Sequence, residues 1–169
     1  MIKKIAIVGP ESTGKSTLSK QLAEYYNTSW VPEFAREYLD KLNRPYQKHD
    51  LLAIAQGQLA HEDKAAANHK LIFCDTNLLV IKIWSDYKYG DCHPWILEKI
   101  KQRYYNLHLL TYIDLPWQED PQREHPETRE QLFDIYKNEL VQMGVQFEII
   151  RGEKEERLRK AIEIIDNYI

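Results

Sequence analysis

The sequence is poor in cysteine and has no long apolar run. Its 169 residues include two cysteines, Cys74 and Cys92, whereas a small secreted domain held together by disulfides carries more. The longest apolar stretches have the length of a strand, so no segment is expected to span a membrane. The N-terminal apolar run, Ile5–Val8, is too short for the core of a signal peptide. These absences favour a cytoplasmic protein without a membrane partner.

The sequence also lacks an excess of positive charge. Lys and Arg total 23 against 26 Asp and Glu, a net charge of −3, so the composition does not favour a nucleic-acid partner. With 43% hydrophobic and 29% charged residues, the chain has the composition of an ordinary globular protein. Its length suits one domain with its own core. We therefore expect residues 1–169 to form a single domain, and the oligomeric state stays open, a homo-oligomer included.

Apolar segments of two kinds alternate along the chain. Short β-branched runs have the length of buried strands, and the segments between them carry apolar residues at helical spacing. This alternation predicts an α/β domain with a parallel sheet. The expected strands are Lys4–Val8, Ser29–Val31, Lys70–Cys74, Leu107–Ile113 and Val145–Ile150. The expected helices are Lys15–Tyr26, Glu33–Leu42, Asp50–Asn68 with Asp50 as N-cap, Leu78–Asp86, one beginning at Pro94, Thr128–Met143 and Glu153–Tyr168, with loops at Tyr87–Pro94 and Leu115–Thr128.

One motif is highly specific. Residues Gly9–Ser16 fit the pattern G-x-x-x-x-G-K-[ST] in full, between an apolar strand and a helix, which is the context of a phosphate-binding loop, or P-loop. Its glycines allow a backbone whose N–H groups point at phosphate oxygens, and the following helix places its positive end on the same anion. Lys15 then reaches the β- and γ-phosphates, and the Ser16 hydroxyl is a ligand for Mg²⁺. The expected nucleotide-binding residues are Gly9, Glu11, Ser12, Thr13, Gly14, Lys15, Ser16 and Thr17.

A P-loop needs an acidic partner for Mg²⁺, usually at the end of a neighbouring apolar strand. Asp75 follows the apolar run Leu71–Cys74 and is the main candidate. It can bind the metal, directly or through water, or accept a proton from a substrate hydroxyl. Its structural alternative is to cap the helix that begins near Asn77. Asp114, after the fourth strand, is a second candidate that we expect to be mainly structural.

Two classes of nucleotide-binding protein fit this sequence poorly. GTP-dependent switches carry an Asn-Lys-x-Asp motif, which this sequence lacks, and motor or remodelling ATPases are normally longer. Cys92-His93 and the other histidines do not have the spacing of a zinc site. The remaining class is a compact enzyme that moves a phosphoryl group onto a small acceptor, with Mg²⁺ brought in by the nucleotide.

Several segments together resemble one family. The P-loop segment Gly9–Thr17 is similar to that of the ribosylnicotinamide kinase domain in NadR-type bacterial NAD-salvage proteins. Later segments follow the same family in order and spacing, and although each alone has low specificity, the resemblance covers nearly the whole chain. These segments are Val31–Tyr38, Cys74–Asn77, Lys82–Ser85, Tyr87–Gly90, Asp114–Trp117 and Asp120–Glu124.

The resemblance implies a P-loop NTPase fold with strand order 2-3-1-4-5, flanking helices and a lid at about residues 116–129. It implies transfer of the γ-phosphoryl group of ATP to the 5′-hydroxyl of nicotinamide riboside, which yields nicotinamide mononucleotide. Longer family members add a nucleotidyltransferase domain with a His-x-Gly-His motif, and some add a DNA-binding helix-turn-helix. This sequence contains neither, so we expect the kinase domain alone.

The resemblance also implies an acceptor site after the second strand. Related nucleoside kinases hold an acidic residue there, so Glu33 and Asp75 are both candidates for the base. Arg36 lies one helical turn after Glu33 and would face the same way. Spacing alone fits a surface ion pair as well as a functional role, and the resemblance favours Arg36 as a substrate-binding residue.

Aromatic faces suit a flat, cationic nicotinamide ring, at about 0.5–2 kcal/mol each. Trp84, Tyr87 and Trp117 are the candidates, and packing in the core is the alternative. Asn77 is a further candidate for a hydrogen bond to the ribose or the carboxamide.

The loop at residues 116–129 is expected to close as a lid. Arg123 and Arg129 would stabilise the charge that develops during transfer, and closure of the lid would exclude water. The alternative is that these two arginines are only solvent-exposed charges of a surface loop. By analogy, the adenine is expected near Gly152. Two other functions stay open: a kinase for another nucleoside or nucleotide, and a nucleotide-binding regulatory module with little turnover.

Overall fold

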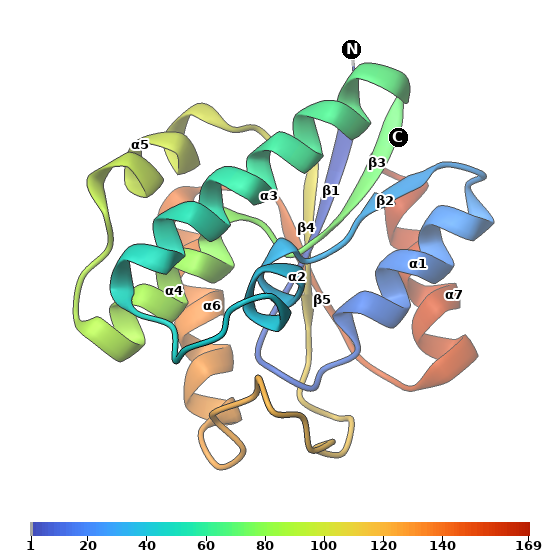
Figure 1. Cartoon of the computed structure of the whole chain (residues 1–169). Coiled ribbons are helices and arrows are strands. Elements are labelled where there is room, and N and C mark those ends of the chain that lie inside the picture. Colours follow the sequence, from blue (N-terminus) through green and yellow to red (C-terminus); the bar gives the residue numbers. More distant parts are fainter. Residues whose placement is uncertain (1) are drawn as a thin grey trace.

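A computed structural model describes residues 2–169 as a five-stranded parallel sheet with helices on both faces (Figure 1). The strand order, β2-β3-β1-β4-β5, confirms the expected order. The strands are β1 (Lys3–Val8), β2 (Ser29–Val31), β3 (Leu71–Asp75), β4 (Leu107–Thr111) and β5 (Phe147–Ile150). The helices are α1 (Lys15–Tyr25), α2 (Phe34–Asp40), α3 (Lys48–Asn68), α4 (Leu78–Tyr89), α5 (Pro94–Gln102), α6 (Arg129–Met143) and α7 (Lys154–Ile165).

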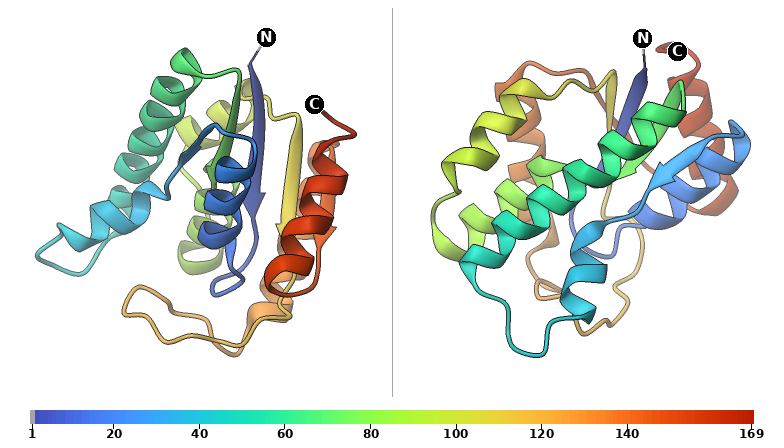
Figure 2. Two further views of the ribbon diagram at one scale, coloured as in Figure 1. Left: turned by 90° about the vertical axis from the view of Figure 1, so that its right-hand side faces the viewer. Right: turned by 45° about the horizontal axis from the view of Figure 1, so that its top comes forward.

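The central strand β1 divides the core into two layers. Ile5 and Ile7 belong to the cluster that contains α1 and α7, whereas Ala6 and Val8 belong to the cluster with α4 and α6. This alternation follows from the period of two in a strand, and all four side chains are completely buried. Figure 2 shows α1 and α7 together on one side of the sheet. Burial of each large apolar side chain contributes about 1.5–3 kcal/mol, so the strand that leads into Gly9 is firmly held.

A third apolar cluster places α2 and α4 beside the sheet. Leu51 and Ile54 of α3 pack with Leu78 and Ile81 of α4 and with Ile96 of α5. Phe34 of α2 packs against the same cluster. The beginning of α2 and one face of α4 are thereby fixed near the carboxyl ends of the strands, the end of the sheet at which the P-loop lies (Figure 1).

Two expected boundaries are wrong, for identifiable reasons. Asp50 is not the N-cap of α3: Gln47 is, and Asp50 is the third helical residue of a capping box, where its carboxylate accepts the Gln47 N–H at 2.6 Å. Arg44 adds two hydrogen bonds of 2.8 Å to that carboxylate and holds the pKa of Asp50 well below its usual range. Helix α4 continues to Tyr89 and ends at the left-handed Gly90, so Tyr87 is helical and not in a loop.

The remaining boundaries differ from expectation by a few residues, as frayed ends do. Between residues 2 and 169, no helix has the length and apolarity that crossing a bilayer requires.

Glu62 is a buried carboxyl group that lies away from the carboxyl ends of the strands. Glu62 of α3 is completely buried, and the Tyr105 hydroxyl donates to both of its oxygens at 2.8 Å. Burial raises the pKa of Glu62 to about 7. The folded state therefore holds a proton that the unfolded state releases at lower pH, and this group makes the protein less stable as the pH rises from about 4.5 to about 7.

The variant Glu62→Gln keeps an acceptor for Tyr105 and removes the titration. We expect the wild-type free energy of unfolding to lose up to about 3 kcal/mol between pH 4.5 and 7.5 through this group, and Glu62→Gln to lack that loss. Urea unfolding across this pH range measures it. Glu24→Gln, at an exposed position, is the control that keeps the wild-type slope. Parallel slopes in wild type and Glu62→Gln would contradict the assignment.

Candidate active site

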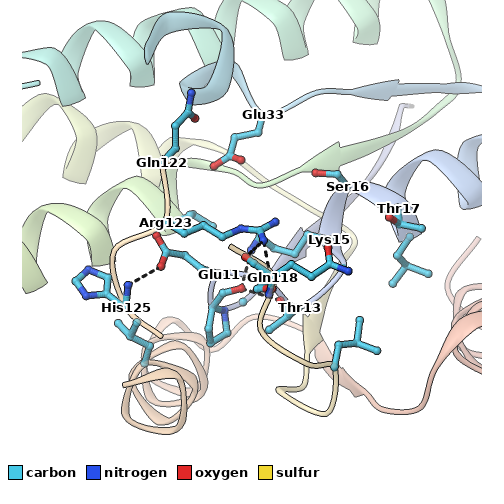
Figure 3. Close-up of a pocket in the computed structure, with 18 of the residues that line it drawn as sticks. Glu11, Thr13, Lys15, Ser16, Thr17, Glu33, Gln118, Gln122, Arg123 and His125 are labelled. Atoms are coloured by element: carbon cyan, nitrogen blue, oxygen red, sulfur yellow. Dashed lines mark hydrogen bonds between the residues drawn. The ribbon is translucent and has the colours of Figure 1, made fainter. Parts of the chain in front are cut away.

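A cavity of about 590 Å³ lies at the carboxyl ends of the strands. The P-loop, α2, α4, the lid, α6 and the beginning of α7 all contribute to its wall. Figure 3 shows Lys15, Ser16, Glu33 and Arg123 around this cavity. Of the residues expected in the site, those that line it are Gly9, Glu11, Ser12, Thr13, Gly14, Lys15, Ser16, Thr17, Glu33, Arg36, Trp84, Tyr87 and Arg123.

The P-loop is held by internal hydrogen bonds and by close contact with β4. Thr13 is buried, and its hydroxyl bonds the Pro10 carbonyl and the Thr111 hydroxyl, both at 2.7 Å. Gly9 has φ 145°, and a Cβ at this position would lie 2.4 Å from Thr111 Oγ1. Gly14 is left-handed, with φ 77°, where the loop enters α1. The two glycines of the motif are therefore required by backbone conformation, and the first also by space.

A buried arginine that the sequence analysis missed fixes the P-loop from behind. Arg157 of α7 donates to the Thr13 carbonyl, to Gly152 O at 2.8 Å and to Asp114 Oδ1 at 2.6 Å. Asp114 also accepts the Gly152 N–H at 2.7 Å. Asp114 thus has a structural role, as expected. No local motif marks Arg157, because its partners are distant in sequence.

Charges of opposite sign meet beside the P-loop. The Ser16 hydroxyl donates to Asp75 Oδ2 at 2.5 Å, and Lys15 Nζ donates to the Pro10 carbonyl at 2.7 Å. Burial lowers the pKa of Lys15, while Glu33 and Asp75 oppose that shift. Burial also raises the pKa of Glu33, and the nearby Asp75 raises it further. Shifted pKa values of this kind are frequent at functional sites, so Lys15 and Glu33 stay candidates for a role in phosphoryl and proton transfer.

The Asp75 carboxylate is buried beside Ser16 and uses one of its two oxygens in a hydrogen bond. Its side chain is 1% exposed, and Oδ1 has no hydrogen-bond partner among the residues that the structure describes. Burial raises the pKa of this carboxyl, against the hydrogen bond from Ser16 and the charge of Lys15. A buried, unpartnered carboxylate oxygen beside a hydroxyl is the kind of donor set that Mg²⁺ takes together with phosphate oxygens. The residues fit the expected metal, and the role of Ser16 and Asp75 as its ligands stays a prediction.

Within residues 2–169, no group of three or more His, Cys, Asp or Glu side chains is placed to hold a metal on its own. Asp75 does not take the alternative role of helix cap, because Asn77 caps α4.

Another part of the cavity wall is aromatic. Trp84 and Tyr87 lie on one face of α4 and line it together with Tyr136 of α6 and His125 of the lid. The Trp84 Nε1–H donates to the Tyr46 hydroxyl at 3.0 Å, which leaves its ring at the wall. The Tyr87 and His125 rings meet edge to face, with centroids 4.9 Å apart. Tyr136 and His125 were missed because nothing in their local sequence separates a pocket aromatic from a core or loop residue.

Asn77 lies elsewhere. It is 3% exposed, its Oδ1 accepts the Leu79 N–H at 3.1 Å, and its Nδ2 lies 3.3 Å from His108 Nε2. These contacts make it the N-cap of α4, outside the lining of the cavity. The expectation that Asn77 binds the acceptor is therefore corrected to a structural role.

Asp75 and three further candidates, Trp117, Arg129 and Gly152, lie next to the cavity without lining it. Arg129 donates to the carbonyls of Ser12 at 3.1 Å and Leu115 at 3.0 Å, and so joins the lid to the P-loop. The Trp117 ring lies 5.7–6.0 Å from the guanidinium groups of Arg123 and Arg129. Trp117 and Arg129 thus stabilise the lid and its contact with the P-loop. The last candidate, Gly152, is held through its backbone by hydrogen bonds with Asp114 and Arg157.

The lid is hydrogen-bonded to the side chain of Ser12 in the P-loop. The Ser12 hydroxyl accepts the Gln118 N–H at 2.9 Å and an Arg123 N–H at 3.3 Å. On its other side the lid reaches α2, where Arg36 pairs with Asp120 at 2.9 Å. Arg36 is therefore ion-paired with a lid residue in this arrangement.

Comparisons with known proteins agree with this architecture. A family model described as an AAA domain matches residues 4–157. The trifunctional NAD biosynthesis/regulator protein NadR of Salmonella typhimurium (strain LT2) is 30% identical over 125 residues, which cover 70% of this chain and 30% of that protein. The protein of the same name from Escherichia coli (strain K12) is 27% identical over 175 residues, 97% of this chain and 42% of that protein. The chain thus spans less than half the length of these relatives.

Solved structures show the same fold. A crystal structure of NadR protein in complex with NR has a TM-score of 0.86 at 24% identity, over 99% of this chain and 49% of that one. A second, in complex with NAD and AMP-PNP, has a TM-score of 0.81 at 22% identity, with the same coverage. Thymidylate kinase from Ehrlichia chaffeensis has a TM-score of 0.72 at 16% identity, over 96% of this chain and 98% of that one.

The space at Gly9 gives a direct test of the loop geometry. We expect Gly9→Ala to lower the free energy of unfolding by about 2–4 kcal/mol and to weaken nucleotide binding, because the methyl group overlaps Thr111 and shifts the loop. Thermal unfolding and nucleotide titration measure both effects.

Gly144→Ala is the matched control. Gly144 is also left-handed, with φ 62°, but a Cβ there meets no atom of residues 2–169 within 4 Å. It should cost only about 1 kcal/mol and leave nucleotide binding intact. Equal costs at the two glycines would show that contact with Thr111 does not constrain the loop.

Proposed function

The chain belongs to the AAA domain family, and from this premise we propose that it is a kinase that transfers the γ-phosphoryl group of ATP to the 5′-hydroxyl of nicotinamide riboside. The product would be nicotinamide mononucleotide, so that the reaction serves NAD salvage. One observation carries the proposal: a single cavity is lined both by the P-loop and by a group of acidic and aromatic residues that includes Glu33. A donor and an acceptor fit in line within one such space.

The relatives support both substrates. The curated relatives act in NAD biosynthesis by their names, and the similar NadR structures hold NR in one case and NAD with AMP-PNP in the other. The kinase fold recurs in thymidylate kinase, which matches the chain over nearly its whole length. The proposed acceptor corresponds to the NR held in one NadR structure, and the proposed donor, ATP, to the AMP-PNP held in the other.

At the donor end, the chain provides positive charge and a rigid backbone. Lys15 is partly exposed, and its ammonium group donates to the Pro10 carbonyl of the P-loop, so its charge lies where the phosphates would bind. Arg123 lines the cavity from the lid and would stabilise negative charge on the transferred group. Mg²⁺ bound with the nucleotide would neutralise charge on the β- and γ-phosphates, with Ser16 and Asp75 as its protein ligands.

Two carboxylates can activate the acceptor. Glu33 and Asp75 lie close enough to raise the pKa of Glu33, and a carboxylate with a raised pKa is a stronger base for a ribose hydroxyl. Asp75 is bonded to Ser16 and is the better candidate for the metal. Glu33, at the acceptor side, is therefore our choice for the group that orients the 5′-hydroxyl.

The chamber around Glu33 favours a cationic nucleoside over a nucleotide. Trp84, Tyr87 and Tyr136 offer aromatic surface, which attracts a cationic ring. Glu11 and Glu33 add negative charge, while Arg36 is paired with Asp120. A monophosphate acceptor would bring its own negative charge against these carboxylates. This charge pattern separates the proposal from a nucleotide kinase of the same fold.

An acceptor panel tests the proposal. We expect nicotinamide riboside to increase ADP release and to give a monophosphate product, with smaller rates for common ribonucleosides and deoxynucleosides and the smallest for nucleoside monophosphates. Coupled ADP assay and chromatography of the product measure this. Lys15→Ala should lower the rate at least about 100-fold, because it removes the charge that binds the phosphates, with an unchanged melting profile.

Lys20→Ala, on the exposed side of α1, is the control and should retain wild-type turnover. ADP release with nicotinamide riboside no greater than with buffer would refute the proposed acceptor. Tight ATP binding with no productive acceptor would instead favour the regulatory module.

A further inference from the structure

One lid residue is bonded to both ends of the cavity. We propose that Glu124 is a positioning residue that couples closure of the lid to assembly of the acceptor chamber, through a latch formed by Glu11, Tyr46, Trp84, Lys88 and Glu124. This inference rests on the proposed kinase function. It assigns a role to three residues outside the P-loop, Tyr46, Lys88 and Glu124, for which the sequence predicts no function, although Lys88 and Glu124 lie in segments that resemble the family.

The donor side of the latch is made by the P-loop. The Glu11 carboxylate accepts the backbone N–H groups of Glu124 at 3.1 Å and His125 at 3.0 Å, and Figure 3 shows Glu11 turned toward His125. A free carboxylate in a loop that receives phosphates would repel them. Two hydrogen bonds from the lid occupy this carboxylate, so its charge serves to hold the lid.

The acceptor side of the latch is made by the Glu124 side chain. It accepts the Tyr46 hydroxyl proton at 2.8 Å and a Lys88 ammonium proton at 2.9 Å. Tyr46 lies before α3 and Lys88 on α4, so the two bonds join the lid to separate parts of the wall. The Glu124 and Lys88 side chains are each 34% exposed. The lid is thereby anchored across the opening of the cavity.

Tyr46 extends the latch to the chamber itself. Its hydroxyl accepts the Trp84 Nε1–H at 3.0 Å while donating to Glu124, and the two rings meet edge to face with centroids 5.0 Å apart. The Lys88 ammonium lies 4.0 Å from the Tyr46 ring centroid. The orientation of the Trp84 ring, which lines the cavity, is therefore linked to the position of the lid.

The latch has a consequence for the reaction. With the lid held, Trp84 is oriented for the acceptor and water is kept from the γ-phosphate. When the latch is broken, the acceptor loses part of its site and water competes for the phosphoryl group. A broken latch should therefore weaken acceptor binding and raise the fraction of ATP that is hydrolysed, with a smaller effect on ATP binding.

The variants Tyr46→Phe and Glu124→Ala test the latch. We expect each to raise the KM for nicotinamide riboside about tenfold, the factor for loss of one hydrogen bond to a charged group, and to raise the ratio of ATP hydrolysed to riboside phosphorylated. The KM for ATP should change less than about twofold. The double variant should be no worse than the more affected single variant, because both break one latch.

Matched controls separate the latch from general damage. Glu127→Ala removes an exposed carboxylate of the same lid, and Tyr104→Phe removes a hydroxyl from a side chain that is 71% exposed. Both should match wild type in KM and in coupling, and all variants should keep the wild-type melting profile. Unchanged KM and coupling in Tyr46→Phe and Glu124→Ala would overturn the proposal.

A readout that needs no acceptor separates failure of the latch from failure of the proposed function. Trypsin cleaves after Arg123, within the lid, and Tyr46→Phe leaves the sequence around that bond unchanged. We expect faster cleavage there in Tyr46→Phe than in wild type or Tyr104→Phe, without faster cleavage elsewhere. Equal cleavage rates after Arg123 would overturn the latch even if the riboside is phosphorylated, and an inactive wild type with faster cleavage in Tyr46→Phe would refute only the acceptor.

Discussion

The site depends on opposite charges that meet at the carboxyl ends of three adjacent strands. The order β2-β3-β1 and the parallel register, in which Ile7 is paired with Asp75, place Asp75 beside the P-loop. Glu33 follows β2 on the same edge, and Lys15 faces both carboxylates. Asp75 is 1% exposed, whereas Lys15 and Glu33 are partly exposed. A buried carboxylate is costly without an opposite charge nearby, and the charge of Lys15 stabilises Asp75 in this position. The sheet order thus brings three residues that are distant in sequence to one place, beside the P-loop.

Much of this arrangement was accessible from the sequence because it depends on local patterns. The P-loop is contiguous, and Asp75 was found because a carboxylate after an apolar strand must lie at the edge of a parallel sheet. Asp50 was expected as the N-cap of α3, three positions after the observed N-cap Gln47, because an acidic residue is favourable both as an N-cap and as the third residue of a capping box. Asn77 was assigned to the acceptor because its motif lies beside Asp75, while its geometry is that of a helix cap.

The residues that sequence reasoning missed act through distant contacts. Arg157 reaches the P-loop carbonyl of a residue 144 positions earlier, and Tyr46 meets a carboxylate 78 positions later. Neither contact can be predicted from the local spacing or composition of the sequence, because the partners are far apart along the chain. Their common effect is rigidity: Arg157 fixes the P-loop from behind, and the latch around Glu124 fixes the lid in front. The chemistry is therefore carried by local motifs, and its geometry by contacts that only the fold creates.

The central claim is that donor and acceptor occupy one continuous cavity at adjacent positions. An analogue that joins the 5′-oxygen of nicotinamide riboside to adenosine through a polyphosphate bridge tests this directly by steady-state inhibition. We predict that it competes with both ATP and nicotinamide riboside and binds more tightly than either, because it pays the entropy of association once. Competition with ATP alone, at an affinity no better than that of ATP, would contradict the claim that the chamber beside Glu33 holds the acceptor.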